Sequence, residues 1–338
     1  MSICVLGDLH LRDDHTYFSK ASEDFLNWFQ NWGRNEKENT LILAGDLVES
    51  SLLSGNVAEY LERLIKYSNF NSIHICVGNH DKRKYHNDDQ LAYEFFKNKA
   101  NIYIYEKATE TVIEGKKVLF LPYFLGLNGI GKTMSEYYGE ISTNKYFTND
   151  YDLVVGHFCG DDASLWGGSD CVPNLDKINT KKLILGHIHT RGYKPSVYIG
   201  SVFACKKNEN DNTRSALVLD NDEWIEERLP VFTEFLTVIY PNPLPRTEAL
   251  TPIYTVLNCK SEAIALSKYP NIAIKRTTTE MSEITGGARN FVSEQEFDAV
   301  KKLSNTEMFK KFMEANKLSY DDSVWGDCLK LMEMEEEG

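Results

Sequence analysis

Five short segments gather the acidic, amide and imidazole side chains that could do chemistry in this chain of 338 residues. Each begins with Gly, and together they hold five of the eight His residues. The segments are GDLH at 7–10, GD at 45–46, GNHD at 78–81, GH at 156–157 and GHIH at 186–189. One such segment alone is more often a simple turn, but five in one chain indicate a shared site.

Metal binding is the chemistry that these residue types favour. Asp8 and His10 are two residues apart, so in an extended backbone both side chains point to one side. The same spacing relates His187 and His189. Mixed carboxylate, amide and imidazole ligands suit manganese, iron or zinc rather than calcium. The candidate ligands are too many for one ion and fit a pair of divalent ions, which can hold a phosphoryl group and activate water.

The elements that must position these segments alternate between short strands and amphipathic helices. Apolar residues at helical spacing predict helices over 18–32 and 57–67. Short apolar runs predict strands at 2–6, 40–44, 72–77, 117–121, 153–155 and 182–185. Most of these runs end in Gly followed by a polar residue, so the polar side chains converge at the carboxyl ends of strands, where α/β sheets bind ligands. The pattern predicts a layered α/β protein.

Composition excludes several classes of protein. The 42% hydrophobic and 26% charged residues are ordinary for a globular domain and argue against disorder or a coiled coil. The seven Cys residues form no CxxC pair, which favours reduced thiols in a cytosolic compartment. Neither a signal-like start nor an apolar run of about 20 residues is present, so we expect a cytoplasmic protein without a membrane partner.

The alternation of strand-like and helical patterns is interrupted after about residue 230, where Pro residues cluster between 230 and 252. Strand-like runs follow at 253–257 and 272–275, with a short helical run at 262–267 between them. Residues 293–318 have an apolar stripe at helical spacing and lead to an acidic tail. We therefore predict a catalytic domain at 1–232, a capping domain at 233–290 and a helical partner-binding segment at 291–338, although packing within the cap explains the stripe equally well.

The five segments, in this order, resemble the calcineurin-like metallophosphoesterase superfamily. The resemblance implies a layered β-sandwich flanked by helices, here with a small α+β capping domain. It implies one metal site formed by Asp8, His10, Asp46 and His189. It implies a second formed by Asp46, Asn79, His157 and His187, with Asp46 bridging the two ions.

Three further residues receive catalytic or supporting roles from the same resemblance. His80 matches the family's non-ligand His, which contacts the phosphate and protonates the leaving oxygen. Glu49 stands where many members have an Asp whose carboxylate orients that His. Asp81 is a candidate for supporting the ligands from behind, with a plain turn carboxylate as the alternative.

Other features resemble SbcD-type nucleases, and phage-encoded recombination nuclease subunits most of all. GDLHL opens the chain, YIGS follows GHIH at 198–201, and roughly 100 residues remain after the catalytic domain. The resemblance implies a manganese-dependent 3′ to 5′ exonuclease and single-strand or hairpin endonuclease, with magnesium, iron or zinc as other candidate ions. It also implies an SbcC-like coiled-coil ATPase partner in DNA recombination and repair, within the host cytoplasm if phage-encoded. The alternatives are a phosphatase acting on a small molecule or protein, and a DNA-binding module with a vestigial site.

A net charge of −13 argues against a simple nucleic-acid coat protein, because phosphate neutralisation requires basic residues. A pair of divalent ions would offset this charge locally. We call the five Gly-initiated segments with candidate ligands the metal-type segments. Basic residues cluster directly after them and are candidate DNA contacts, although each cluster alone is more often a solvated loop. These residues are Lys82, Arg83, Lys84, Arg191, Lys194, Lys206 and Lys207.

Residues 126–133, GLNGIGKT, match the phosphate-binding P-loop pattern, with Lys132 and Thr133 as its nucleotide ligands. Pro122 and three further residues separate this loop from the preceding strand, which is unlike a P-loop. We therefore expect a Gly-rich loop at the rim of the site. The helices at 18–32 or 57–67 could also form a homodimer contact, but core packing explains their apolar residues as well.

Overall fold

The computed structural model describes residues 2–32, 39–82, 90–123, 149–160, 171–172, 175–193, 197–210, 214–239, 241–257, 259, 268 and 273–277. By its internal contacts the chain divides into residues 1–277 and residues 278–338, and every described residue belongs to the first unit. The predicted partner-binding helix at 293–318 and the GLNGIGKT loop lie outside the described residues, as does the short helical run at 262–267. The domain boundaries at 232 and 290 stay predictions.

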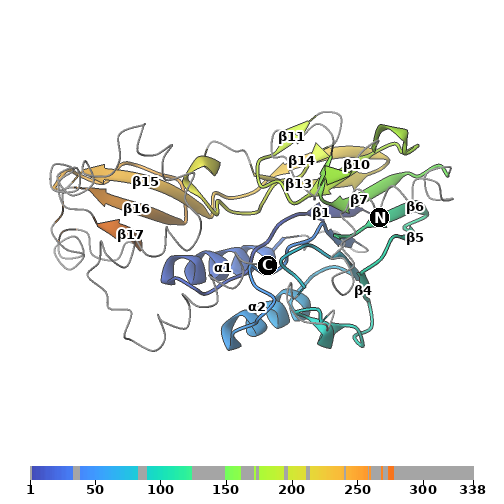
Figure 1. The fold of residues 1–338 in the computed structure, drawn as a ribbon, viewed down its shortest axis with the longest axis horizontal. Coiled ribbons are helices and arrows are strands. Elements are labelled where there is room, and N and C mark those ends of the chain that lie inside the picture. The colour runs from blue at the N-terminus through green and yellow to red at the C-terminus, as the bar shows by residue number, and fades with distance from the viewer. Residues whose placement is uncertain are drawn as a thin grey trace, which may run out of the picture. The chain divides into compact units, whose positions relative to one another are not determined.

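The first of two large sheets has the strand order β14-β13-β1-β2-β3-β4 (Figure 1). Strands β1 to β4 are parallel, while β13 runs antiparallel to β1 and β14 antiparallel to β13. The bounds are Ile3–Leu6 for β1, Thr40–Leu43 for β2, Ser72–Cys76 for β3, Ile102–Tyr105 for β4, Ser215–Asp220 for β13 and Glu223–Arg228 for β14. Three of these strands, β1, β2 and β3, lead directly into metal-type segments.

The second large sheet has the order β11-β12-β10-β7-β6-β5. Its central strands are parallel, and the edge strands β5 and β11 are antiparallel to their neighbours. The bounds are Thr109–Ile113 for β5, Lys116–Leu121 for β6, Leu153–His157 for β7, Leu183–Gly186 for β10, Gly192–Tyr193 for β11 and Val197–Tyr198 for β12. A separate pair, β8 (Cys159–Gly160) and β9 (Cys171–Val172), lies outside this sheet.

Alternation of side chains along the strands packs the two sheets face to face. Val5 and Ile42 from the first sheet share a buried cluster with Val155 and Ile184 from the second. The opposite face of the first sheet buries residues such as Leu43 in a second cluster, against the apolar faces of the helices. This two-sheet sandwich with flanking helices confirms the predicted fold class.

The two helices begin and end close to the predicted positions. Helix α1 spans Thr16–Phe29 and α2 spans Gly55–Lys66. The Ser54 side chain caps α2 by accepting a hydrogen bond from the Val57 N–H at 3.2 Å. Within the described residues, no helix combines the length and the apolar character that a membrane span requires.

A third sheet, with three parallel strands, follows the two large sheets in the chain. It contains β15 (Thr233–Ile239), β16 (Thr251–Leu257) and β17 (Ala273–Thr277) in that order. Phe235 and Ile253 pack in one buried cluster with Phe18 of α1. The Thr251 hydroxyl donates to Asp24 Oδ2 at 2.7 Å, which also ties β16 to α1. This sheet occupies the region where we predicted the capping domain.

His74 of β3 provides a test of the sheet-to-sheet core. Its ring is buried, stacks on Tyr103 with centroids 4.6 Å apart, and Nδ1 lies 2.7 Å from the Tyr105 hydroxyl. Burial lowers the pKa of His74 from 6.5 to about 4. The unfolded chain therefore binds a proton at this residue before the folded chain does, and stability falls as the pH drops from 6.5 toward 4.

We expect His74→Phe to remove roughly 2 kcal/mol of this acid destabilisation. The measurement is urea unfolding of metal-free wild type and variant at about pH 7.5 and about pH 4.5. Equal pH dependence of the two proteins would contradict a neutral, buried His74.

Candidate functional site

All five metal-type segments lie where strands end. Asp8 and His10 follow β1, Asp46 follows β2, Asn79 follows β3, and the remaining segments, at 156–157 and 186–189, lie at the ends of β7 and β10. Because these strand ends belong to the two packed sheets, residues separated by up to 179 positions come into contact, as with the His187 N–H that donates to Asp8 Oδ1 at 2.9 Å. The predicted convergence of these segments is therefore present in the structure.

The backbone of this site is strained in the manner of a functional loop cluster. Asp8, His10, Asp46 and His187 all have positive φ, at 47°, 43°, 48° and 82°. Non-Gly residues adopt this left-handed region at an energetic cost, which is commonly found where side chains must converge on a ligand.

The Gly residues that open the segments make room for the neighbouring strand end. A Cβ on Gly78 would lie 2.2 Å from Asp46 Oδ1, and one on Gly186 would lie 2.1 Å from the Ala44 carbonyl oxygen. Neither contact is tolerable, so Gly is required at both positions for the loops to approach each other.

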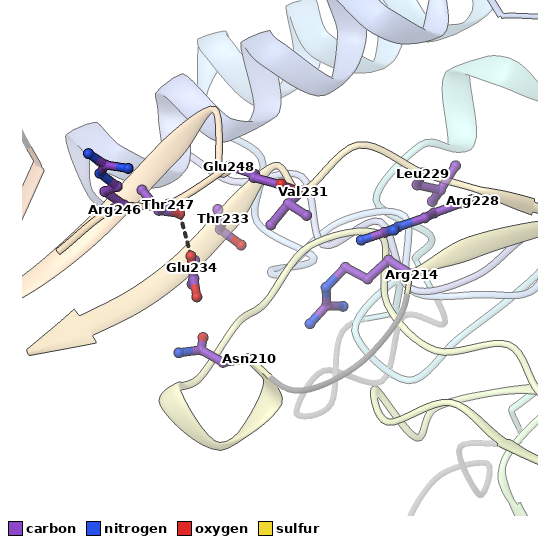
Figure 2. Close-up of a pocket in the computed structure, with 10 residues that line it drawn as sticks. All are labelled: Asn210, Arg214, Arg228, Leu229, Val231, Thr233, Glu234, Arg246, Thr247 and Glu248. Carbon is purple, nitrogen blue, oxygen red and sulfur yellow. Dashed lines mark hydrogen bonds between the residues drawn. The ribbon is translucent and has the colours of Figure 1, made fainter.

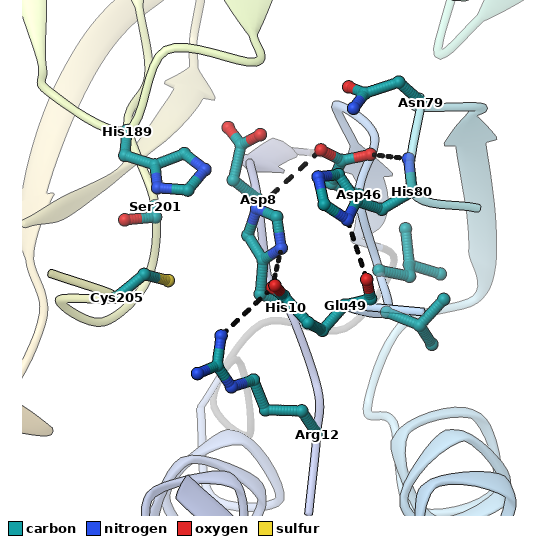
Figure 3. A network of polar contacts seen from close by, with 12 residues as sticks. Asp8, His10, Arg12, Asp46, Glu49, Asn79, His80, His189, Ser201 and Cys205 are labelled. Atoms are coloured by element: carbon teal, nitrogen blue, oxygen red, sulfur yellow. Dashed lines mark hydrogen bonds and ion pairs between the residues drawn. The ribbon is translucent and has the colours of Figure 1, made fainter. Parts of the chain in front are cut away.

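Asp46 lies at the centre of the cluster (Figure 3). Its Oδ2 is 3.2 Å from His157 Nε2 on one side and 3.7 Å from His10 Nε2 on the other. Its Oδ1 accepts a hydrogen bond from the His80 N–H at 2.8 Å. One carboxylate oxygen therefore lies between imidazoles of both predicted ion sites.

The side of Asp46 that faces β7 and β10 carries the predicted second ligand set. Asn79 Oδ1 lies 3.0 Å from His157 Nε2 and 2.9 Å from His187 Nδ1. His157 Nδ1 donates to the Ala44 carbonyl at 2.8 Å, which leaves Nε2 as its lone-pair nitrogen. Asp46, His157 and His187 offer ligand atoms that all lie within 4.8 Å of one another.

The side that faces β1 carries the predicted first set. Asp8, His10 and His189 also offer ligand atoms within 4.8 Å of one another. Among the described residues, the buried Asp8 Oδ2 and His10 Nε2 have no hydrogen-bond partner. Buried polar atoms without partners are costly, and a cation at this point would satisfy both. The donor set of carboxylate, amide and imidazole groups fits a pair of divalent ions.

Electrostatic coupling across the cluster is strong. Burial favours the protonated form of Asp46, but His157 and His10 hold the pKa of its carboxyl well below the usual range. The pKa of Asp8, by contrast, is raised by burial. Burial also opposes protonation of His157, yet the Asp46 carboxylate raises the pKa of this His to about 9. An imidazole must lose a proton before it binds a metal ion, so the raised pKa of His157 predicts that metal binding releases a proton.

His80 and Glu49 are in contact, but not through the groups that the resemblance implies. His80 Nδ1 donates to the main-chain carbonyl of Glu49 at 2.7 Å. The Glu49 carboxylate turns instead to His10 Nδ1 at 2.8 Å and to Arg12 Nη1 at 3.2 Å. The expectation that a carboxylate orients His80 is therefore corrected: the longer Glu side chain reaches past His80 to His10, and its backbone holds His80.

The Asp81 carboxylate joins two loops of the site. Its Oδ2 accepts from the Gly78 N–H at 2.8 Å and the Asp46 N–H at 3.1 Å, and its Oδ1 accepts from the Leu47 N–H at 2.9 Å. Burial raises the pKa of Asp81 to about 6, with the neighbouring Asp46 adding to the effect. Asp81 therefore positions the loop that carries Asp46.

We expect Asp81→Asn to lower the free energy of unfolding by about 2 kcal/mol or more, because the new amide N–H₂ would face backbone N–H donors. Urea unfolding of the metal-free protein measures the loss, and manganese titration should show weaker binding. Asp222→Asn, at an exposed turn, is the matched control. Equal stability of Asp81→Asn and wild type would contradict this positioning role.

The basic residues predicted to contact DNA differ in their exposure and in their ion-pair partners. Lys82 is buried with Nζ 3.3 Å from Glu106 Oε2, and the Arg191 side chain is 5% exposed with Nη2 3.2 Å from Glu226 Oε2. These two engaged cations are poorly placed to clamp a phosphate. Lys206 and Lys207 are exposed, and Lys207 Nζ donates to Thr237 Oγ1 at 2.9 Å. Arg83, Lys84 and Lys194 lie outside the described residues.

Sequence reasoning missed two residues beside His189. Glu209 Oε1 lies 3.1 Å from His189 Nδ1, and Cys205 lies in the same cluster. Both follow the YIGS segment, but no spacing rule connects them to GHIH, so no sequence signal identified them.

A separate pocket of about 690 Å³ is lined in part by Asn210 (Figure 2). Its lining includes Arg214, Arg228 and Arg246 together with Glu234, and the Thr247 hydroxyl donates to Glu234. None of the predicted site residues is among those that line it. The metal-type cluster and this pocket are therefore distinct places in the described part of the chain.

Comparison with known proteins agrees with the geometry. The family model for calcineurin-like phosphoesterases matches residues 1–191, which is more than half of the chain. No curated protein gives a significant match. A solved phosphopantetheinyl hydrolase from Mycobacterium tuberculosis is 15% identical over 60% of this chain and 89% of its own, with a TM-score of 0.37. A protein of unknown function from Aquifex aeolicus is 17% identical over 58% of this chain and 82% of its own, with a TM-score of 0.29.

Proposed function

Because the chain belongs to the calcineurin-like phosphoesterase family, a family of metal-dependent hydrolases, we propose that it is a two-metal phosphodiesterase that cleaves DNA. One observation carries the two-metal part of the proposal. Asp46 Oδ2 lies 3.2 Å from His157 and 3.7 Å from His10, which is the arrangement that two ions sharing one carboxylate require.

Seven residues would hold the ions. Asp8, His10, Asp46 and His189 would bind one, and Asp46, Asn79, His157 and His187 the other. When bound, a pair of divalent ions lowers the pKa of water and stabilises charge on the attacking and leaving oxygens. The chain fixes which nitrogens face this centre: the Ala44 carbonyl holds His157 Nδ1, so Nε2 faces Asp46 and Asn79.

His80 supplies the proton in this proposal. Its Nδ1–H is held by the Glu49 carbonyl, so a proton that moves to the leaving sugar oxygen comes from Nε2. The His80 backbone N–H also donates to Asp46 Oδ1, which keeps the ring at a set distance from the bridging carboxylate. Glu49 thus acts as a positioning residue for His80 through its backbone and for His10 through its side chain.

DNA as the substrate is supported by the motifs rather than by the geometry. GDLHL at the start, YIGS after GHIH and the roughly 100 residues that follow the catalytic domain are the features that resemble SbcD-type nucleases. On this basis we propose manganese as the metal, 3′ to 5′ exonuclease activity on duplex ends and endonuclease activity on single strands or hairpins. An SbcC-like ATPase would be the partner in cytoplasmic DNA recombination and repair.

A side-by-side assay tests the substrate. The full chain with manganese is offered labelled duplex DNA, a DNA hairpin, bis-p-nitrophenyl phosphate and p-nitrophenyl phosphate. Cleavage of both DNAs and of the diester, with little hydrolysis of the monoester, supports the proposal. Hydrolysis of p-nitrophenyl phosphate without cleavage of DNA would identify a phosphatase instead. Inactivity on all four substrates would contradict the proposal that the protein is an active phosphoesterase.

A further inference from the structure

A second kind of ligand cluster adjoins the proposed ion pair. His189, Cys205 and Glu209 each offer one ligand atom, and these atoms all lie within 4.8 Å of one another. Cys205 is 8% and Glu209 5% exposed. Figure 3 shows Cys205 on the same side of the site as His189, next to Asp8 and His10. The cluster therefore places a thiol beside a centre whose other ligands are nitrogen and oxygen.

Hydrogen bonds hold this cluster in its present shape. Glu209 Oε2 accepts from the Cys205 N–H at 2.7 Å, while Oε1 faces His189 Nδ1 at 3.1 Å. The buried Arg214 holds the backbone on both sides of Cys205. Its Nη2 donates to the Glu209 carbonyl at 3.0 Å, and its Nη1 donates to the Ser201 carbonyl at 2.6 Å. The three side chains are thus pre-arranged and need no rearrangement of the loop to meet one ion.

We propose that His189, Cys205 and Glu209 form a zinc site that adjoins the proposed catalytic ion pair and shares His189 with it. Thiolate ligands select zinc over manganese and magnesium, because a soft sulfur ligand adds little to the binding of hard cations. Three protein ligands with one solvent position make the ordinary open tetrahedral zinc geometry. The Cys205 thiol lies 3.7 Å from the Phe203 carbonyl oxygen and also contacts His189, and it would give up its proton on binding zinc.

Zinc at this site withdraws His189 from the neighbouring ion site. A neutral imidazole has one lone-pair nitrogen, and the nitrogen that faces Glu209 is Nδ1. When Nδ1 binds zinc, Nε2 carries the proton and no longer offers a lone pair to an ion held by Asp8 and His10. Zinc bound at this site therefore inhibits hydrolysis. This inhibition rests on the proposed function, whereas zinc binding through Cys205 does not depend on it.

The first experiment detects the bond itself in the full chain. Wild-type protein loaded with manganese receives one equivalent of zinc, and zinc-edge X-ray absorption should show a sulfur neighbour at about 2.3 Å. Cobalt in place of zinc should give a sulfur-to-cobalt charge-transfer band. Cys205→Ser should lose both signals, and the matched variant Cys259→Ser, at another buried Cys located two residues beyond β16, should keep both.

A zinc shell of nitrogen and oxygen only in wild-type protein would overturn the proposal without any variant. Persistence of the sulfur signal in a folded Cys205→Ser variant would overturn it equally, because another thiol would then hold the zinc. Thermal melting of each variant establishes that it is folded.

The second experiment measures inhibition. Zinc added to the manganese enzyme should reduce diester hydrolysis, and Cys205→Ser should raise the half-inhibiting zinc concentration by about tenfold or more. Equal zinc sensitivity of wild type and variant would overturn the inhibitory role. If no phosphoester is hydrolysed at all, the proposed function fails, yet the sulfur signal still decides the zinc site.

Discussion

Asp46→Asn is expected to abolish binding of both metal ions and to reduce phosphodiester hydrolysis by more than about 10³-fold. The reason is that Asp46 Oδ2 lies between His10 and His157, so one oxygen serves both ligand sets. The amide that replaces it is uncharged and, as a metal ligand, weaker than a carboxylate. Substitution of any other proposed ligand changes only one set directly.

Isothermal titration with manganese measures the number of ions bound, and bis-p-nitrophenyl phosphate measures the activity. Asp222→Asn makes the same chemical change at an exposed turn and should bind and hydrolyse as wild type does. Retention of one tight ion by Asp46→Asn would show that the carboxylate does not bridge.

His80→Ala is expected to keep both manganese ions and to lose about 10² to 10⁴-fold in DNA cleavage. The His80 ring donates from Nδ1 to the Glu49 carbonyl, and the His80 backbone N–H donates to Asp46 Oδ1. A proposed proton donor need not hold metal, although its ring lies near enough to His10 and Asp46 to form a ligand group with them. Metal titration of the variant therefore separates the two roles.

The leaving group supplies a second readout for His80. Nitrophenolate departs as an anion and needs no proton, whereas the sugar oxygen of DNA does need one. The loss in His80→Ala should accordingly be far smaller on bis-p-nitrophenyl phosphate than on DNA. Equal losses on both substrates, or loss of a bound ion, would contradict a proton-donor role.

Most of the candidate ligands can be predicted from the sequence, because each one follows a strand within a few residues. A buried strand that ends in Gly and then a polar residue places that polar group at a sheet edge, whatever the rest of the chain does. GDLH, GNHD and GHIH each follow this rule, and β1, β3 and β10 end where the apolar runs end. The layered α/β architecture and its two helices were predictable on the same grounds, from apolar runs of strand length and from helical spacing, whereas the sandwich was implied by the family resemblance.

Contacts between distant loops could not be predicted, because they depend on how the backbone turns after each strand. Glu49 shows this: its position after Asp46 is a sequence fact, but positive φ at Asp46 and His10 directs its carboxylate to His10 and leaves its carbonyl for His80. Arg191 shows it in another way, since Glu226 of β14 removes it from the set of accessible cations.

The chain order of the ligand-type residues already indicates a metal-dependent phosphoesterase, because five strands place these residues at their ends. Which groups support those ligands is decided by tertiary structure. Asp81 accepts from four backbone N–H groups in the loops that follow the neighbouring strands β2 and β3, and Glu209 meets His189 after a 20-residue interval that contains two short strands. Those partners are selected by strand pairing and packing, which act on positions in space rather than on intervals along the chain.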